Sequence, residues 1–319
     1  MTSFNDDTPG ADDLRRIWSI ETVEPQDKIK QGIGVERDGY FEAGLQLIPG
    51  TSSDFIKKSF CSYAASQGFE VVEDLSITVS NIWFVPLAGA KERLESLACH
   101  SFVRVLRPIP QLRAFRPLVR ASGITSKVIL PNEPPVANDV HVAILDGGLP
   151  EKSGLSPWVN NYVKSDPSAN DCDGGTEHGL GVTSAFLFGP LKPNQEAAKP
   201  FSYVDHHRVL DSFIGSEDPY ELYRTLGHIE DILLSRQYEF LNLSLGPSLA
   251  VDDDEIHSWT SLIDEYLADG ETFMTVAAGN NGEADSEFGL DRIQIPSDSV
   301  NAVAAVSYTH LTLPTTPVV

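Results

Sequence analysis

The stretch that decides the fold is HVAILDGG, residues 141–148, in which an apolar run ends in Asp146 and two glycines. A short apolar run bounded by turn residues is typical of a strand that is buried on both faces of a parallel sheet. Similar runs recur downstream, separated by helical stretches: FSYV (201–204), FLNLSLG (240–246), ETFMTVAAGN (271–280) and NAVAAV (301–306). This alternation predicts an α/β domain over residues 139–305, with helices on both faces of a parallel sheet.

Residues 41–113 have a different pattern of apolar residues, which predicts strands and helices in the order βαββαβ. FEAGLQLIP (41–49) alternates as a strand does, and a serine-capped helical stretch follows it at residues 52–68. The order predicts a small α+β domain of the ferredoxin-like, split βαβ type.

Two further segments read as connecting regions. Residues 1–40 are polar, acidic and rich in turn formers, so we expect a flexible arm there. Residues 114–138 contain several prolines and no clear period, which indicates a linker. Within that linker, ITSKVILP (124–131) could still pair as an edge strand.

The composition argues against several classes of function. The chain has 319 residues, 41% of them hydrophobic, which is enough for one large domain and a smaller one. A net charge of −23 without a Lys/Arg run argues against nucleic acid and anionic membranes as partners, and favours neutral or basic substrates. The N-terminus does not resemble a signal peptide, and no apolar run approaches the ~20 residues that span a bilayer. Cys61, Cys99 and Cys172 lack metal or disulfide spacing, so we expect a cytoplasmic protein.

Two residues of the predicted sheet can carry chemistry. Asp146 ends its strand, and the reactive groups of an open parallel sheet gather at the carboxyl ends of the strands. A carboxylate there can fix the tautomer of an imidazole and stabilise its protonated form. His178 opens the helical stretch HGLGVTSAFLFG, from which it could act as a general base. Taken singly, Asp146 is better explained as a turn or helix-cap residue, and His178 as a satisfied histidine at a helix start.

Four motifs, in the same order along the chain, resemble those of the subtilase (subtilisin-like) serine peptidases. VAILDGG resembles the aspartate motif, with DGG at residues 146–148 in place of Asp-(Ser/Thr)-Gly. HGLGVTSAFLFG (178–189) resembles the histidine motif His-Gly-Thr-x-Val-Ala-Gly, with Leu180 in place of threonine. NLSLG (242–246) resembles the substrate-binding strand, and AAGNNG (277–282) the oxyanion segment.

The resemblance implies a subtilisin-like α/β fold and a serine endopeptidase that acts on peptide or protein substrates. Asp146 would orient the imidazole, His178 would be the general base, and the Asn280 amide would stabilise the oxyanion. The edge that would pair with an extended substrate consists of Ser244, Leu245 and Gly246. The pocket for the side chain before the scissile bond, with room for a sizeable apolar group, would be lined by Ala277, Ala278 and Gly279. These three small residues could instead only pack against a neighbouring helix.

The nucleophile motif of the family, Gly-Thr-Ser-x-Ala-x-Pro, is absent from this sequence. The nearest imitation, GPSLA (246–250), precedes the oxyanion segment, so we do not expect Ser248 to be the nucleophile. Cys172 lies in the polar turn NDCDGG without a strand-to-helix elbow, and we expect a plain free cysteine.

The end of the chain offers a reason for the missing serine. VSYTHLTLPT (306–315) resembles the translation of a sequencing adapter, although an ordinary threonine-rich strand and turn is the alternative. We therefore expect residues 306–319 to be foreign, and the peptidase domain to be incomplete and inactive as printed.

The N-terminal α+β unit resembles the prodomain that subtilases use as folding chaperone and inhibitor, whose tail would cross the active-site cleft. A permanent regulatory or partner-binding domain is the alternative, because fold alone does not define function. A rival for the whole chain is a non-catalytic subtilase-fold protein that binds peptides or a partner through residues 244–246.

No cofactor is expected. Calcium is frequent in the family, and two acidic groups have the oxygen ligands that hard cations bind: Asp252, Asp253, Asp254 and Glu255, and Asp171, Asp173 and Glu177. For both groups we favour ordinary surface carboxylates, the first of them preceding a helix whose dipole suits negative charge.

Overall fold

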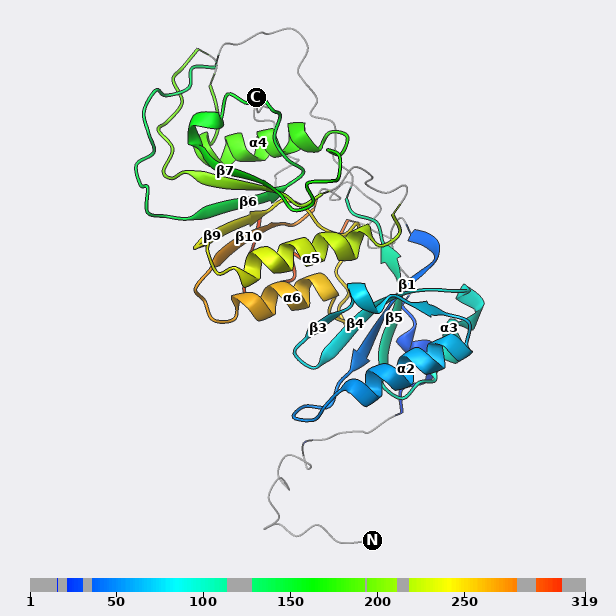
Figure 1. The fold of residues 1–319 in the computed structure, drawn as a ribbon. Helices are drawn as coiled ribbons and strands as arrows, with labels where there is room; N and C mark the ends of the chain where they lie inside the picture. The colour runs from blue at the N-terminus through cyan, green and yellow to red at the C-terminus, as the bar shows by residue number, and fades with distance from the viewer. Residues whose placement is uncertain are drawn as a thin grey trace, which may run out of the picture.

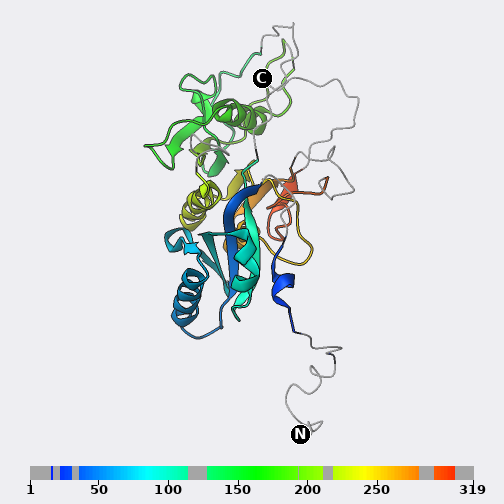
Figure 2. The ribbon, with the colours of Figure 1, turned by 90° about the vertical axis from the view of Figure 1, so that its right-hand side faces the viewer.

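The structure, a computed structural model of the chain, describes residues 16, 22–30, 36–113, 128–192, 194–210, 218–279 and 291–305. It consists of an N-terminal antiparallel sheet with helices and a parallel α/β sheet (Figure 1). The two units are stacked along one axis, with the N-terminal unit at the lower end in Figure 2. No helix in these ranges is long and apolar enough to cross a membrane.

The N-terminal unit is the predicted antiparallel α+β sheet, with one short strand, β3, that the predicted order βαββαβ does not include. Its elements are β1 (Glu36–Gln46), α2 (Asp54–Ser66), β2 (Glu70–Val71), η2 (Glu73–Leu75), β3 (Ile77–Val79), β4 (Ile82–Ala88), η3 (Lys91–Arg93), α3 (Leu94–Ala98) and β5 (Val103–Pro110). The strand order is β2-β4-β1-β5, with β3 also on β4, and every pair is antiparallel. Alternate residues Phe41, Ala43 and Leu45 of β1 enter the same core as Ile56 and Phe60 of α2.

Part of the range in which we expected a flexible arm is packed on this unit. A short 3-10 helix, η1 (Pro25–Lys28), precedes β1. The Lys28 ammonium donates to the Ala98 carbonyl at 3.0 Å, and Ile29 bridges to Leu106 of β5. The structure also starts β1 at Glu36, five positions before the predicted strand.

The second unit is the predicted parallel sheet, covered on both faces. Its elements are β6 (Val142–Asp146), η4 (Ser156–Trp158), β7 (Val159–Lys164), α4 (Gly175–Phe188), β8 (Val204–Arg208), α5 (Glu221–Leu234), β9 (Phe240–Leu243), α6 (Ser258–Leu267), β10 (Phe273–Ala277) and β11 (Val303–Ala305). The order is β11-β10-β9-β6-β8-β7, with all pairs parallel. Helix α4 covers one face, and α5 and α6 cover the other (Figure 1).

Strand β6 shows how the two faces are filled. Val142 and Ile144 belong to the hydrophobic cluster on the α4 side, whereas Ala143 and Leu145 belong to the cluster on the α5 and α6 side. Side chains alternate along a strand, so Asp146 follows Val142 and Ile144 and leaves the strand on the α4 side.

Two strands differ from the sequence prediction. The pattern predicts no strand at β7, whose VNNYVK side chains are mostly exposed at the edge of the sheet. A strand is predicted at FSYV (201–204), but the observed strand is β8, VDHHR, which begins at Val204. Three polar residues of β8 are buried. His206 Nδ1 lies 3.0 Å from the Thr183 hydroxyl, His207 Nε2 lies 2.8 Å from the Tyr238 hydroxyl, and Arg208 donates to backbone carbonyls. These polar partners allow burial that an apolar pattern cannot reveal.

One hydrophobic cluster contains residues of both units. Ile77 and Val79 of β3 are buried in the same cluster as Leu222 of α5 and Trp259 of α6. Helices α5 and α6 therefore lie between the two sheets (Figure 1). The N-terminal unit is packed on the parallel sheet domain through an apolar surface rather than tethered beside it.

Candidate active site

Asp146 and His178 meet at the carboxyl end of β6. The Asp146 side chain is fully buried, and its Oδ1 lies 2.8 Å from His178 Nδ1. The same oxygen accepts a hydrogen bond from the Gly147 N–H at 2.7 Å. The His178 side chain is 27% exposed in the first turn of α4. An ionised carboxylate on Nδ1 selects the tautomer in which Nε2 accepts a proton, which is the arrangement of a general base and its orienting acid.

Close backbone packing of glycines brings this histidine to the aspartate. A Cβ on Gly147 would lie 2.6 Å from the Gly175 Cα, and a Cβ on Gly179 would strike the Gly148 carbonyl. The first turn of α4 therefore rests directly on the chain that leaves β6. This contact also explains why glycine stands at position 147, where the resemblance leads one to expect serine or threonine.

Cys172 is a buried free cysteine, as expected. It is 4% exposed, and its Sγ packs against Gly175 at the start of α4. Burial raises the pKa of this thiol to about 12. A thiol with that pKa has almost no thiolate at neutral pH, so the structure does not support Cys172 as a nucleophile.

The last residue of the predicted substrate-binding edge, and the two residues after it, are paired with the chain's own residues 111–113. Ser244, Leu245 and Gly246 follow the end of β9. The Arg113 N–H donates to the Gly246 carbonyl at 2.9 Å.

The antiparallel pairing continues over the next two residues of this segment. Leu112 bridges Pro247 in the antiparallel sense, and the Ser248 N–H donates to the Gln111 carbonyl at 2.7 Å. A segment that continues from β5 thus lies along this edge as an added strand would.

The predicted pocket residues lie at the same end of the sheet. Val276 of β10 is in register with Leu243 of β9, so Ala277, Ala278 and Gly279 emerge beside the edge just described. Gly279 has φ +101°, a conformation that favours glycine, and a Cβ there would lie 2.5 Å from Gln294 Oε1. Asn280, the expected oxyanion donor, lies outside the described residues, so its role stays a prediction.

Arg113, which no sequence motif indicates, places its side chain between these segments. Its two terminal nitrogens donate to the carbonyls of Ala277 and Ile295, each at 3.2 Å. A Cβ on Gly246 would lie 2.2 Å from Nη2 of Arg113, so the guanidinium is in close contact with the glycine. Burial lowers the pKa of Arg113 to about 10, which leaves it protonated at neutral pH.

A buried charge network joins the two units near the start of α6. Glu42, 1% exposed on β1, accepts hydrogen bonds from Arg107 Nε at 2.8 Å and from the Ser258 hydroxyl at 2.9 Å, and it also accepts from the Tyr223 hydroxyl. Burial alone would raise the pKa of Glu42, but the charge of Arg107, together with these hydrogen bonds, lowers it to about 2.

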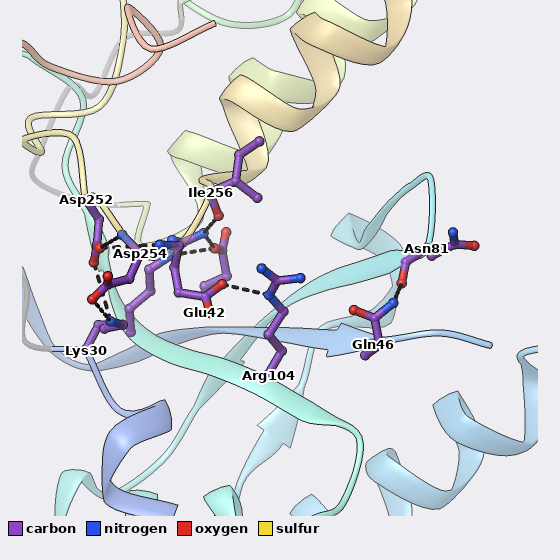
Figure 3. A network of polar contacts seen from close by, with 10 residues as sticks. Lys30, Glu42, Gln46, Asn81, Arg104, Asp252, Asp254 and Ile256 are labelled. Atoms are coloured by element: carbon purple, nitrogen blue, oxygen red, sulfur yellow. Dashed lines mark hydrogen bonds and ion pairs between the residues drawn. The ribbon is translucent and has the colours of Figure 1, made fainter. Parts of the chain in front are cut away.

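The first acidic run lies beside this network (Figure 3) and is paired with basic residues. Lys30 Nζ lies 3.3 Å from Asp254, and Arg104 Nε lies 2.7 Å from Glu255. Both cations come from the N-terminal unit, so the run contributes to the contact between the units. In the described ranges, no group of three or more His, Cys, Asp or Glu residues could hold a metal ion.

Comparison with known proteins identifies the class. The model of the subtilase family matches residues 137–315, and the chain therefore belongs to this family. The match runs past Ala305 into residues 306–315, so our interpretation of that segment as an adapter stays a prediction.

A chain from the solved structure of the subtilase cytotoxin SubAB assembly is similar at 14% identity and a TM-score of 0.35. The similarity covers 54% of this chain and 56% of that chain, so this chain spans little more than half of its length. No curated protein matches the chain.

Proposed function

We propose that this protein is a subtilisin-like serine endopeptidase, in which Asp146 orients His178 and His178 acts as the general base. The observation that carries the proposal is the 2.8 Å contact between Asp146 Oδ1 and His178 Nδ1 at the strand ends of a subtilase domain. The buried carboxylate would stabilise the imidazolium that forms when a serine hydroxyl is deprotonated. We place the oxyanion donor at Asn280 and the serine in coding sequence downstream of Ala305.

The substrate class in this proposal is a peptide or protein that binds as an extended strand along residues 244–246. The antiparallel pairing of residues 111–113 with residues 246–248 supports it, because an extended main-chain segment already lies at the end of this edge. We further propose that the N-terminal unit acts as an intramolecular inhibitor, since the segment that follows β5 covers the same edge. The three free cysteines support a reducing, cytoplasmic setting.

The decisive experiment is to recover the uninterrupted gene and treat its product with a fluorophosphonate probe for serine hydrolases. Labelling at a downstream serine that is lost in His178→Ala supports the proposal. The matched controls are His141→Ala, an exposed histidine just before β6, and Ser248→Ala, and both should retain labelling. Loss of labelling in Ser248→Ala would instead assign the nucleophile to Ser248.

N-terminal sequencing of the same product tests the inhibitor role. A mature N-terminus between residues 113 and 138, with the released unit inhibiting the peptidase when it is added back, supports it. An active enzyme that keeps its N-terminal unit uncut contradicts it and favours a permanent regulatory domain.

The rival function is a non-catalytic peptide-binding protein on the same fold. The observation that favours it is the edge pairing itself, which requires no nucleophile. A complete gene without a reactive serine, combined with peptide binding at residues 244–246, would establish it.

A further inference from the structure

We propose that the pocket between Gly246, Ala277 and Ile295 selects an arginine side chain, so that substrates carry arginine where this chain carries Arg113. This inference rests on the proposed function and names its substrate class. It differs from the apolar preference that the small residues of the pocket suggested from sequence.

The first argument is the chemistry of the pocket walls. The Arg113 guanidinium donates to two backbone carbonyls that come from different segments, Ala277 at the end of β10 and Ile295 beyond it. A guanidinium presents several N–H donors in a rigid planar fork, which suits two acceptors on separate walls. A leucine or phenylalanine in the same place would bury both carbonyls without this donor, and unsatisfied buried acceptors weaken binding.

The second argument is shape. A Cβ on Gly246 would overlap Nη2 of Arg113 and lie 2.5 Å from the Ile295 carbonyl oxygen. The guanidinium therefore occupies a narrow space, here called the slot, beside the glycine backbone and the Ile295 carbonyl. A planar guanidinium fits this slot, which is open only because residue 246 has no side chain.

The third argument is that Arg113 is presented as a substrate side chain would be. Its N–H is bonded to the Gly246 carbonyl, and the preceding Leu112 is 5% exposed in the hydrophobic core. Successive side chains of an extended strand point to opposite sides, so an edge-bound peptide can deliver one residue to the pocket while its neighbour packs elsewhere.

The charge of the protein acts in the same direction. The net charge is −23, and an anionic protein attracts cationic peptides to its surface. Arg113 keeps its charge at neutral pH although burial lowers its pKa to about 10. A cationic side chain can therefore enter the pocket without losing its proton.

The test is a binding measurement that does not depend on catalysis. Arg113→Ala empties the pocket, and two small probes are then titrated by NMR. Agmatine carries a guanidinium on a four-carbon stem, and in N-carbamoylputrescine a neutral urea replaces the guanidinium while the amine at the other end is kept. We expect the full chain with Arg113→Ala to bind agmatine at least about tenfold more tightly than N-carbamoylputrescine, and the unmodified chain to bind neither, because Arg113 fills the slot.

A second substitution locates the binding site. Adding Gly246→Ala to Arg113→Ala narrows the slot and should abolish agmatine binding. Gly227→Ala, in α5, is the matched control, because a Cβ there meets no atom within 4 Å. Thermal unfolding checks that each variant is folded. Equal binding of both probes, or agmatine binding that persists in the folded Gly246→Ala variant, would overturn the inference.

An activity measurement on the uninterrupted gene product separates this inference from the proposed function. Fluorogenic peptides Pro-Gln-Leu-X, with X as arginine, citrulline or leucine, are compared by kcat/KM. A preference for arginine of at least about tenfold supports the inference. Preference for leucine overturns the inference and leaves the peptidase intact. Absence of cleavage and of probe labelling overturns the peptidase, and the agmatine titration then still decides the specificity of the pocket.

Discussion

A Cβ atom on Gly147 would lie 2.6 Å from the Cα of Gly175, so these two glycines hold the end of β6 directly against the start of α4. We predict that Gly147→Ser destabilises the protein by roughly 1–3 kcal/mol, although it restores the commoner family motif, because the new side chain meets backbone that cannot move aside. The same collision should separate His178 from Asp146. Urea denaturation measures the first effect, and probe labelling of the active enzyme measures the second.

A glycine in open surroundings provides the control for this substitution. A Cβ on Gly227 of α5 meets no atom within 4 Å, so Gly227→Ala should stabilise the protein by about 0.5–1 kcal/mol through helix propensity. An unchanged urea midpoint in Gly147→Ser would contradict the close packing of β6 on α4.

Much of the fold could be predicted from sequence because its strands carry a simple signal. Strands β6, β9 and β10 are short apolar runs buried between helices, and their pattern alone predicts them. Strand β7 gives no such signal because it lies exposed at the edge of the sheet. The polar side chains of β8 are buried because they form hydrogen bonds with residues distant in sequence: His206 with Thr183, and His207 with Tyr238. A local sequence pattern does not reveal such partners.

The candidate site divides in the same way. Asp146 and His178 lie within local motifs. Side chains alternate between the two faces of β6, and this alternation directs Asp146 toward α4, the helix that carries His178. Arg113 could not be predicted, because a single arginine before a linker has no pattern of its own. Its partner Ala277 lies 164 residues away, and only the tertiary structure brings the two together.

Two arginines of β5 provide a matched test of the contact between the units. Arg107 pairs with Glu42 where both side chains are at most 6% exposed, whereas Arg104 pairs with Glu255 at 39% and 18% exposure. We predict that Arg107→Met costs roughly 3–5 kcal/mol of unfolding free energy, because it leaves the Glu42 charge buried without its cation. Arg104→Met should cost less than about 1 kcal/mol. Similar losses from both substitutions would show that burial does not govern this interface.

Acid should weaken the same network. The pKa of Glu42 is about 2 in the folded protein, below its ordinary value of 4.5, so its ionised form is stabilised by folding. That stabilisation is complete above the ordinary pKa and is lost as the pH falls through about 2. We therefore expect the difference in unfolding free energy between wild type and Glu42→Gln to be constant above about pH 5 and to shrink below it. A difference that is independent of pH down to 2 would contradict the ionised assignment.

His257 titrates in a different pH range from Glu42, so the two groups can be distinguished by their pH dependence. Burial, followed by the charge of Arg107, lowers the pKa of His257 from 6.5 to about 3, so the folded protein holds this histidine neutral. Its contribution is complete above the ordinary pKa and is lost as the pH falls through about 3. The gap between wild type and His257→Gln should therefore begin to change near pH 6.5, well before the gap for Glu42→Gln. Coincident curves would mean that the two variants report one titration.

The reactivity of the cysteines tests the environment at the start of α4. Cys172 is buried with its pKa raised to about 12, whereas Cys99 is exposed. We predict that iodoacetamide at pH 8 modifies Cys99 in the native protein and leaves Cys172 unmodified until urea unfolds the chain, because only an accessible thiolate reacts. Peptide mapping by mass spectrometry measures both sites, and Cys99→Ser confirms the assignment. Rapid native modification of Cys172, or loss of fluorophosphonate labelling in Cys172→Ser, would show that this thiol is exposed to the active site and would reopen its role as a nucleophile.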